Sequence, residues 1–307
     1  MDEGGFTRRR FLLAAAAGVG VLAGAGAGVV ELVDHGVLPG KSALDRLDGA
    51  CSVDVPHLDV ATVGPTVSGR FASARRHTDV GYSIAYPPGH GPGDALPLIV
   101  MLHGFGGDHR SAFAGMQPAQ GLALRVDGRP LTPMAMVTVD GGGGYWNPHP
   151  GDDPMGMVLD ELVPMCRDRG LGVPPHRIAA MGISMGGYGA ILFAERFPEV
   201  FSAAAAISPA IWTTYAEARQ ANPGAYASAA SFAACDAVTH AGRLSATPVR
   251  VASGDSDPFH PGVVAFARAC PPNVEVVLSK GCHTGAFFTE QEVPSLAFLS
   301  RHLAAPA

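Results

Sequence analysis

Ser184 lies at the centre of Gly182-Ile183-Ser184-Met185-Gly186, which fits the G-x-S-x-G pattern of a serine on a sharp strand-to-helix turn. Bulky side chains do not fit two residues before or after such a serine, and both positions are glycine here. The apolar run 178–183 leads into the motif, and an Ala-rich stretch begins at Tyr188. This context predicts that Ser184 is a nucleophile at a helix N-terminus, whereas the motif alone would also fit an ordinary glycine-rich helix entry.

A serine hydroxyl needs a base that removes its proton, and the base needs a carboxylate that orients it. Asp257 follows the apolar run 249–252, and His283 follows the last such run, 274–278. This is the order nucleophile, acid, histidine that a strand–turn–helix nucleophile requires. We therefore predict His283 as general base and acid, and Asp257 as its orienting carboxylate, with Asp255 as the competing candidate.

Two other histidines lie near candidate positions. His260 comes three residues after Asp257, which suits the wall of a substrate pocket better than a catalytic base. His103 opens the loop His103-Gly104-Phe105-Gly106-Gly107, and we expect it to hold that loop by hydrogen bonds. Neither is predicted to replace His283.

Acyl chemistry also needs N–H groups that stabilise an oxyanion. The residue after the nucleophile, Met185, supplies one such group in strand–turn–helix sites, and the loop after the third strand supplies the other. We predict that the second donor is Phe105, with Gly104 and Gly106 as neighbouring alternatives.

A glycine run, residues 141–144, precedes Tyr145 and Trp146. Such runs cradle phosphates in nucleotide enzymes, but no G-K-[ST] follows and no helix opens on these glycines. We expect a loop that presents Tyr145 and Trp146 to a substrate, with a place in the core as the alternative for Trp146. Asp255 and Asp257 lack the third carboxylate of a calcium loop, and no C-x-x-C pair exists, so no metal or cofactor is predicted.

Short apolar runs bounded by turn residues must position these groups, because buried parallel strands have this pattern. They alternate with helical stretches, which indicates a mostly parallel, doubly wound α/β sheet with helices on both faces. Together with the G-x-S-x-G turn and the order nucleophile, acid, histidine, this predicts an α/β-hydrolase fold. Residues 212–244 are predicted to form a helical insertion before the strand that leads to Asp257. The predicted strands are 70–73, 81–86, 98–102, 134–139, 178–183, 203–207, 249–252 and 274–278, and the predicted helices are 156–166, 188–197 and 295–303.

The composition is that of a well-packed globular chain. Of its 307 residues, 47% are hydrophobic and 16% are charged, which argues against disorder. The net charge is −6 and there is no Lys/Arg stripe, so nucleic acid is not an expected partner.

Residues 1–30 differ from the remainder. Arg8-Arg9 followed by Phe11-Leu12 and an Ala/Gly/Val run resembles a twin-arginine export signal. A membrane anchor is the alternative interpretation. Residues 31–66 are expected to form a tether or extension, and 67–307 the catalytic domain. The protein is thus expected outside the cytoplasm, secreted or associated with the cell envelope, and an uncleaved signal would retain it at the membrane.

Export would permit a disulfide. Three of the five cysteines, Cys235, Cys270 and Cys282, lie in the C-terminal part, and any pairing among them is left open.

Several motifs together carry a family resemblance. They are the HGFGG loop, Tyr145-Trp146 followed by the Glu161-Leu162 helix, GISMGG, GDSDPF and GCHTGAFF. They resemble the putative-esterase (esterase D-like) family of α/β-hydrolases, which includes S-formylglutathione hydrolases and mycolyltransferases, over roughly residues 67–303. The resemblance implies a carboxylic-ester hydrolase or acyltransferase in which Ser184, Asp257 and His283 form the triad.

Two departures from these relatives affect the choice of reaction. The S-formylglutathione hydrolases have no export signal, which argues against glutathione detoxification. The mycolyltransferases usually have Glu as acid and Trp after the histidine region, where this chain has Phe287-Phe288.

We therefore predict an exported serine esterase that acts on a small-molecule or lipid ester through an acyl-enzyme. The alternative is an acyltransferase that moves an acyl chain to a sugar or a cell-envelope alcohol. A non-catalytic envelope-binding module is a further alternative, against which the intact nucleophile, acid and histidine order argues. Acyl length depends on the space between the insertion and the Tyr145 loop, which the sequence does not give. The oligomeric state is equally open.

Overall fold

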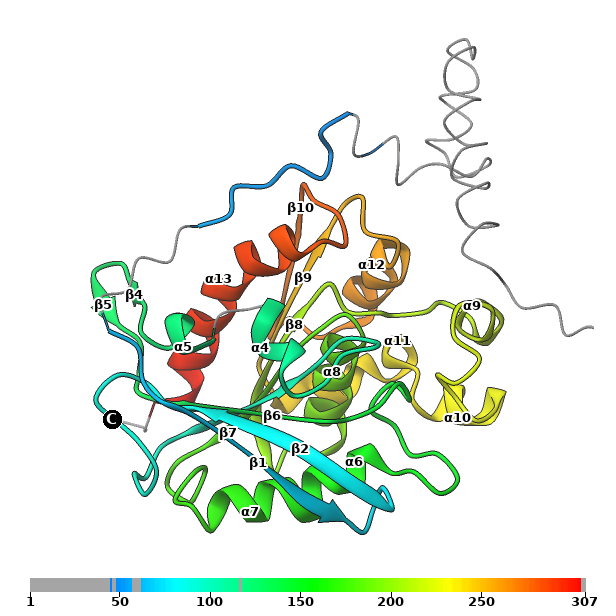
Figure 1. Ribbon diagram of the computed structural model, residues 1–307. Coiled ribbons are helices and arrows are strands. Elements are labelled where there is room, and N and C mark those ends of the chain that lie inside the picture. Colours follow the sequence, from blue (N-terminus) through cyan, green and yellow to red (C-terminus); the bar gives the residue numbers. More distant parts are fainter. Residues whose placement is uncertain (1–44, 46–47, 57–61, 116–117, 305–307) are drawn as a thin grey trace, which may run out of the picture. The chain divides into compact units, whose positions relative to one another are not determined.

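The computed structural model describes residues 45, 48–56, 62–115 and 118–304 (Figure 1). Contacts divide the chain into two units, Met1–Ser52 and Val53–Ala307. The export signal predicted for residues 1–30 and part of the extension predicted for 31–66 lie outside the described residues. The start of a catalytic domain at residue 67 stays a prediction. No helix among the described residues is both long and apolar enough to span a membrane.

One eight-stranded sheet organises the described part of the second unit, in the order β1-β2-β6-β3-β7-β8-β9-β10. The strands β3 and β6 to β10 run parallel to one another, whereas β1 and β2, at one edge, are antiparallel to their neighbours. The strands are β1 (Thr66–Ser73), β2 (Thr78–Ala85), β3 (Leu98–Leu102), β6 (Ala135–Val139), β7 (Ile178–Ile183), β8 (Phe201–Ile207), β9 (Val249–Gly254) and β10 (Val274–Ser279). The predicted mostly parallel sheet is therefore confirmed.

Helices cover both faces of the sheet (Figure 1). One face carries α6 (Pro154–Met157), the π-helix η1 (Val158–Leu162), α7 (Val163–Arg167), α8 (Met185–Arg196) and α12 (His260–Ala269). The other face carries α4 (Ser111–Gly115) and the long α13 (Gly285–Leu303), with α5 (Pro118–Gly121) beside α13. This is the doubly wound arrangement that the alternating runs predicted.

The strand residues explain why two layers of helices are needed. In β3, Leu98, Val100 and Leu102 pack in the cluster that includes α8, and Ile99 and Met101 pack in the cluster that includes α13. Successive side chains of a strand point to opposite faces, so an unbroken apolar run must be covered on both sides.

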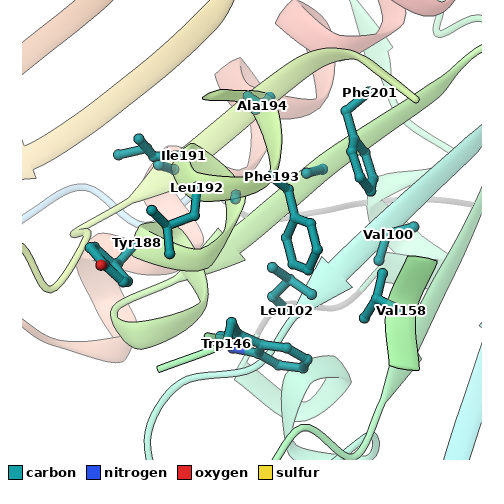
Figure 2. Packing of buried hydrophobic residues seen from close by; sticks show 14 of the residues in the cluster. Val100, Leu102, Trp146, Val158, Tyr188, Ile191, Leu192, Phe193, Ala194 and Phe201 are labelled. Carbon is teal, nitrogen blue, oxygen red and sulfur yellow. The ribbon is translucent and has the colours of Figure 1, made fainter. Parts of the chain in front are cut away.

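Phe193 of α8 shows how tightly the first cluster is filled. Its ring centroid lies 5.3 Å from that of Phe201, and Figure 2 shows it directed toward Val100 and Leu102. Burial of a side chain of this size stabilises the fold by about 1.5–3 kcal/mol. The helix that follows Ser184 is therefore anchored to the sheet.

The insertion predicted for residues 212–244 is also helical. It contains α9 (Tyr215–Ala221), α10 (Ala229–Ala234), α11 (Ala237–His240) and the 3₁₀-helix η2 (Ala241–Ala246), and it ends just before β9. Thr214, Ser228 and Asp236 each cap one of its helices through a side-chain oxygen.

Other element boundaries differ from the predictions. The last helix begins at Gly285 rather than Ser295, because Thr284 caps it by accepting a hydrogen bond from the Phe287 N–H, and Pro294 lies inside it. The small hairpin of β4 (Arg125–Val126) and β5 (Arg129–Pro130) was not predicted. Its strands are two residues long, too short to leave an apolar pattern.

The cysteine pairing is also corrected. Cys235 and Cys270 have free thiols, so none of the pairings left open among Cys235, Cys270 and Cys282 occurs. Cys282, the residue before His283, is disulfide-bonded.

Candidate active site

Ser184 lies on a strained turn between β7 and α8. Its φ is 56° and its ψ is −119°, a conformation that side chains other than glycine rarely adopt. A Cβ on Gly182 would lie 2.2 Å from the carbonyl carbon of Gly186, and a Cβ on Gly186 would lie 1.9 Å from the carbonyl oxygen of Leu102. The steric reason for both glycines is thus visible in the backbone.

Hydrogen bonds fix this turn from both sides. The Ser184 N–H donates to the Ile207 carbonyl at 2.9 Å, and the Ser184 carbonyl accepts from the N–H groups of Tyr188 and Ala210, each at 3.0 Å. The nucleophile is therefore bound to its own helix and to the end of β8.

His283 joins Ser184 to Asp257. Its Nε2 lies 2.9 Å from the Ser184 Oγ, and its Nδ1 lies 2.8 Å from Oδ2 of Asp257. The Asp257 side chain is fully buried and that of His283 is 24% exposed. A carboxylate only accepts, so Nδ1 carries the proton and Nε2 is free to accept one from the serine.

Asp257 also has a second partner, because its Oδ1 accepts from the Phe259 N–H at 2.8 Å. Asp255, the competing candidate, is exposed and accepts instead from the Gly281 N–H at 3.3 Å. His260 lies at the start of α12, with Nδ1 3.0 Å from the Gly254 carbonyl. Of the two aspartates, only Asp257 contacts the imidazole in the described structure.

Two phenylalanines that were not predicted as site residues flank His283. The Phe259 ring centroid lies 5.3 Å from that of the imidazole, and the Phe288 centroid lies 5.1 Å from it, both in edge geometry. Each belongs to a motif noted above, GDSDPF and GCHTGAFF. The sequence placed them near the triad but carried no signal that their rings would contact the imidazole.

The loop after β3 is held by His103, as expected. The buried ring has Nδ1 2.8 Å from the Gly104 carbonyl, and Nε2 accepts from the Gly141 N–H at 2.9 Å. These partners require the neutral ring with a proton on Nδ1. Burial agrees with this, because it lowers the pKa of His103.

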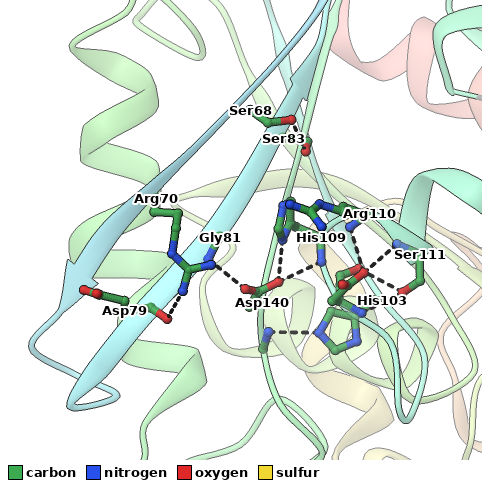
Figure 3. A network of polar contacts seen from close by, with 12 residues as sticks. Ser68, Arg70, Asp79, Gly81, Ser83, His103, His109, Arg110, Ser111 and Asp140 are labelled. Atoms are coloured by element: carbon green, nitrogen blue, oxygen red, sulfur yellow. Dashed lines mark hydrogen bonds and ion pairs between the residues drawn. The ribbon is translucent and has the colours of Figure 1, made fainter.

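A wider polar network supports the same region (Figure 3). Asp140 accepts from the Gly81 N–H at 2.7 Å through Oδ2, and from both the N–H and the Nδ1 of His109 through Oδ1. Burial opposes the charge on Asp140, but these hydrogen bonds prevail and lower its pKa. The network fixes the start of the glycine run beside the His103 loop.

This arrangement constrains the Gly104–Phe105 peptide. The Gly104 carbonyl contacts Nδ1 of His103 and also accepts from the Gly107 N–H at 3.1 Å. In a trans peptide the Phe105 N–H points in the direction opposite to this carbonyl. A Cβ on Gly104 would lie 3.6 Å from the Ser184 Cβ, so the loop passes beside the nucleophile. Met185 is the first residue of α8, where N–H groups lack helical partners.

Phe105 is 63% exposed, whereas Tyr145 and Trp146 are buried. Tyr145 accepts a hydrogen bond from Trp212 Nε1 at 3.1 Å. Trp146 has no exposed surface and donates from Nε1 to the His103 carbonyl at 3.2 Å. The prediction that Trp146 is presented to a substrate is therefore wrong, and the alternative, a place in the core, is correct. Gly141 and Gly189 make room for its ring.

Asp108, His109 and Asp140 lie close enough to hold a metal ion, as one such group among the described residues. Their oxygens and Nδ1 already take part in hydrogen bonds: Asp108 Oδ1 accepts from the N–H groups of Arg110 and Ser111, and Asp140 binds His109. These contacts give the cluster a structural role in the loop network.

Comparison with known proteins agrees with this geometry. The family model described as "Putative esterase" matches residues 73–270. No curated protein matches the chain. Among solved structures, a ferulic acid esterase has a TM-score of 0.68 at 17% identity, over 79% of this chain and 99% of that one.

Two further structures are similar. An S-formylglutathione hydrolase from Agrobacterium tumefaciens has a TM-score of 0.62 at 18% identity and covers 80% of this chain and 98% of its own. MPT51 (FbpC1) of Mycobacterium tuberculosis has a TM-score of 0.60 at 17% identity, over 78% and 99%. At these identities the likeness establishes the α/β-hydrolase fold.

Proposed function

Because this chain belongs to the putative esterase family and is a carboxylic ester hydrolase, we propose that it works through a Ser184–His283–Asp257 triad and an acyl-enzyme. The observation that carries the proposal is the continuous hydrogen-bond path from the Ser184 Oγ through both imidazole nitrogens to a buried carboxylate. A serine in this setting becomes a nucleophile when its proton moves to Nε2.

In the proposed reaction the Ser184 Oγ attacks the ester carbonyl carbon, and Nε2 of His283 takes the hydroxyl proton. The C–O bond to the alcohol then breaks, and the same nitrogen protonates the leaving oxygen. Water, deprotonated by His283, then attacks the acyl-enzyme carbonyl, the bond to the Ser184 Oγ breaks, and His283 returns the proton to that oxygen, which releases the acid and free Ser184. Asp257 stabilises the imidazolium that forms in each half of the reaction.

The backbone N–H groups of Met185 and Phe105 are the proposed donors to the oxyanion. The position of Met185 at the start of α8 supports the first, and the fixed Gly104–Phe105 peptide beside Ser184 supports the second. Donors held in place before the reaction stabilise the developing charge without reorganisation.

The test is hydrolysis of p-nitrophenyl acetate by the wild-type chain and by Ser184→Ala. We expect the substitution to lower kcat by about 10⁴-fold or more while circular dichroism stays unchanged. A Ser184→Ala variant that retains its activity would disprove the nucleophile.

The same assay distinguishes hydrolysis from transfer if trehalose is added as an acceptor. We expect free acid as the product with and without the sugar. An acylated sugar as the main product would replace the esterase proposal with an acyltransferase.

We also propose that the protein is exported as a folded chain, secreted or associated with the cell envelope. The support is the Arg8-Arg9 pair with the apolar run behind it. Replacement of both arginines by lysine is expected to leave the protein in the cytoplasmic fraction, where esterase activity and immunoblotting detect it. Unchanged export of the double variant would contradict the proposal.

A further inference from the structure

The structure places Trp212, the first residue of the insertion, in a fixed position near the nucleophile. The segment that leads to it follows β8, and the Ala210 N–H donates to the Ser184 carbonyl at 3.0 Å. A Cβ on Gly262 would lie 2.0 Å from the Ile211 carbonyl oxygen, so α12 packs directly on this segment. The backbone before Trp212 is thus held between the turn that carries Ser184 and the first turn of α12.

The indole is fixed on two further sides. Its Nε1 donates to the Tyr145 hydroxyl at 3.1 Å, and its ring packs edge-on against Phe259, with centroids 4.8 Å apart. Phe259 in turn contacts the His283 imidazole. Two ring contacts therefore connect Trp212 to the catalytic base, and a hydrogen bond connects it to the loop after β6.

The surface that Trp212 offers is apolar. Its one N–H is bound to Tyr145, and burial raises the pKa of Tyr145, so that hydroxyl stays neutral. The indole itself is only partly buried and packs against the core cluster. A large aromatic ring held in this way forms an apolar wall, and a side chain or ligand group that overlaps a well-packed ring has to displace it at a cost.

We propose that Trp212 sets the length of the acyl group that this chain hydrolyses, and that it restricts the enzyme to esters of short acids. The inference rests on the proposed esterase function. Because Ser184, Tyr145 and Phe259 hold the segment and the ring, the indole cannot rotate aside without losing contacts on each side. An acyl chain of several carbons that extends from Ser184 toward the insertion meets this ring.

The experiment compares kcat/KM for p-nitrophenyl acetate and p-nitrophenyl octanoate. We expect the wild-type chain to prefer the acetate. Trp212→Ala should raise the octanoate-to-acetate ratio of kcat/KM by about tenfold or more, because pocket discrimination between chains that differ by methylene groups is of this order. If Trp212→Ala does not fold, Trp212→Leu, which keeps much of the apolar volume, measures the same ratio.

Tyr215→Ala is the matched control. Tyr215 is a partly buried aromatic residue of the same insertion, and its ring contact is with Phe232. Its ratio should equal that of the wild type. An unchanged ratio in the folded Trp212 variants, or an equal shift in Tyr215→Ala, overturns the inference.

The failure of this inference is distinguishable from failure of the proposed function. If the wild-type chain hydrolyses acetate through Ser184 but Trp212 has no effect on the ratio, only the inference fails. If neither ester is hydrolysed, the proposed function fails with it.

Discussion

Nδ1 of His283 lies 2.8 Å from Oδ2 of Asp257, and the carboxylate is fully buried. Asp255, two residues earlier, is exposed and bound to the backbone of Gly281. The two aspartates thus have different surroundings although they share one loop.

This difference predicts the behaviour of two matched variants. Asp257→Asn removes the carboxylate that orients the imidazole, and we expect kcat to fall by about 10⁴-fold. Asp255→Asn should change kcat by less than about threefold, since it loses one weak contact at the surface. Steady-state kinetics on p-nitrophenyl acetate measures both. A larger loss in Asp255→Asn than in Asp257→Asn would show that Asp255, not Asp257, is the orienting acid.

The two hydrogen bonds of the His103 ring can be tested separately for their effect on the oxyanion loop. His103→Asn keeps an N–H that reaches the Gly104 carbonyl, whereas His103→Gln keeps an acceptor for the Gly141 N–H. We expect His103→Ala to lower kcat by about 10–100-fold with little change in KM, because loss of a whole oxyanion donor costs about 10²–10³-fold.

The two conservative variants then identify which contact matters. His103→Asn should recover more of kcat than His103→Gln. The opposite order would show that the Gly141 contact, not the orientation of the Gly104–Phe105 peptide, is what the ring contributes.

Glu195 of α8 predicts a pH dependence of stability. Its side chain is fully buried beside Arg243, and burial raises its pKa from 4.5 to about 7 despite that arginine. The folded state therefore holds a proton that the unfolded state releases above pH 4.5. This contribution to stability is complete below pH 4.5 and is lost as the pH rises toward 7 and beyond.

Removal of the titrating group should flatten this dependence. Thermal unfolding between pH 5 and 8 is expected to show a smaller fall in Tm for Glu195→Gln than for the wild type. Glu199→Gln, at an exposed position nearby, is the control and should follow the wild-type curve. If the Glu195→Gln and wild-type curves run parallel, Glu195 does not titrate in this range.

Gly186 predicts a steric limit at the nucleophile turn. A Cβ there would lie 1.9 Å from a backbone oxygen, whereas a Cβ on Gly285 meets no atom within 4 Å. Overpacking costs about 1–3 kcal/mol even where side chains can adjust. We expect Gly186→Ala to lower Tm by about 5–10 °C and Gly285→Ala to leave it within about 2 °C, as measured by calorimetry. Equal Tm values for the two variants would contradict this steric account.

Much of the fold could be predicted because its signals are local. The run Leu98–Leu102 is unbroken and apolar, and it forms β3 with the same bounds. The glycines at positions 182 and 186 indicate directly that the turn has no room for larger residues. The order of the apolar runs before Asp257 and His283 then predicted that both residues follow the carboxyl ends of neighbouring parallel strands.

What could not be predicted depends on contacts between distant segments. Trp146 is buried because Gly141 and Gly189 leave space for it, which its own neighbourhood in the sequence does not indicate. The start of the last helix depends on the cap at Thr284, whereas the predicted helix began only at residue 295. The rings of Phe259 and Phe288 meet His283 only through packing of α12 and α13.

The most direct test of the account is to map the covalent adduct of a fluorophosphonate probe by mass spectrometry. We predict one modified residue, Ser184, in the wild-type chain, and strongly reduced labelling in His283→Ala, because the serine then lacks its base. An adduct on another residue, or a Ser184 that does not react in a chain that still hydrolyses p-nitrophenyl acetate, would contradict the proposed nucleophile.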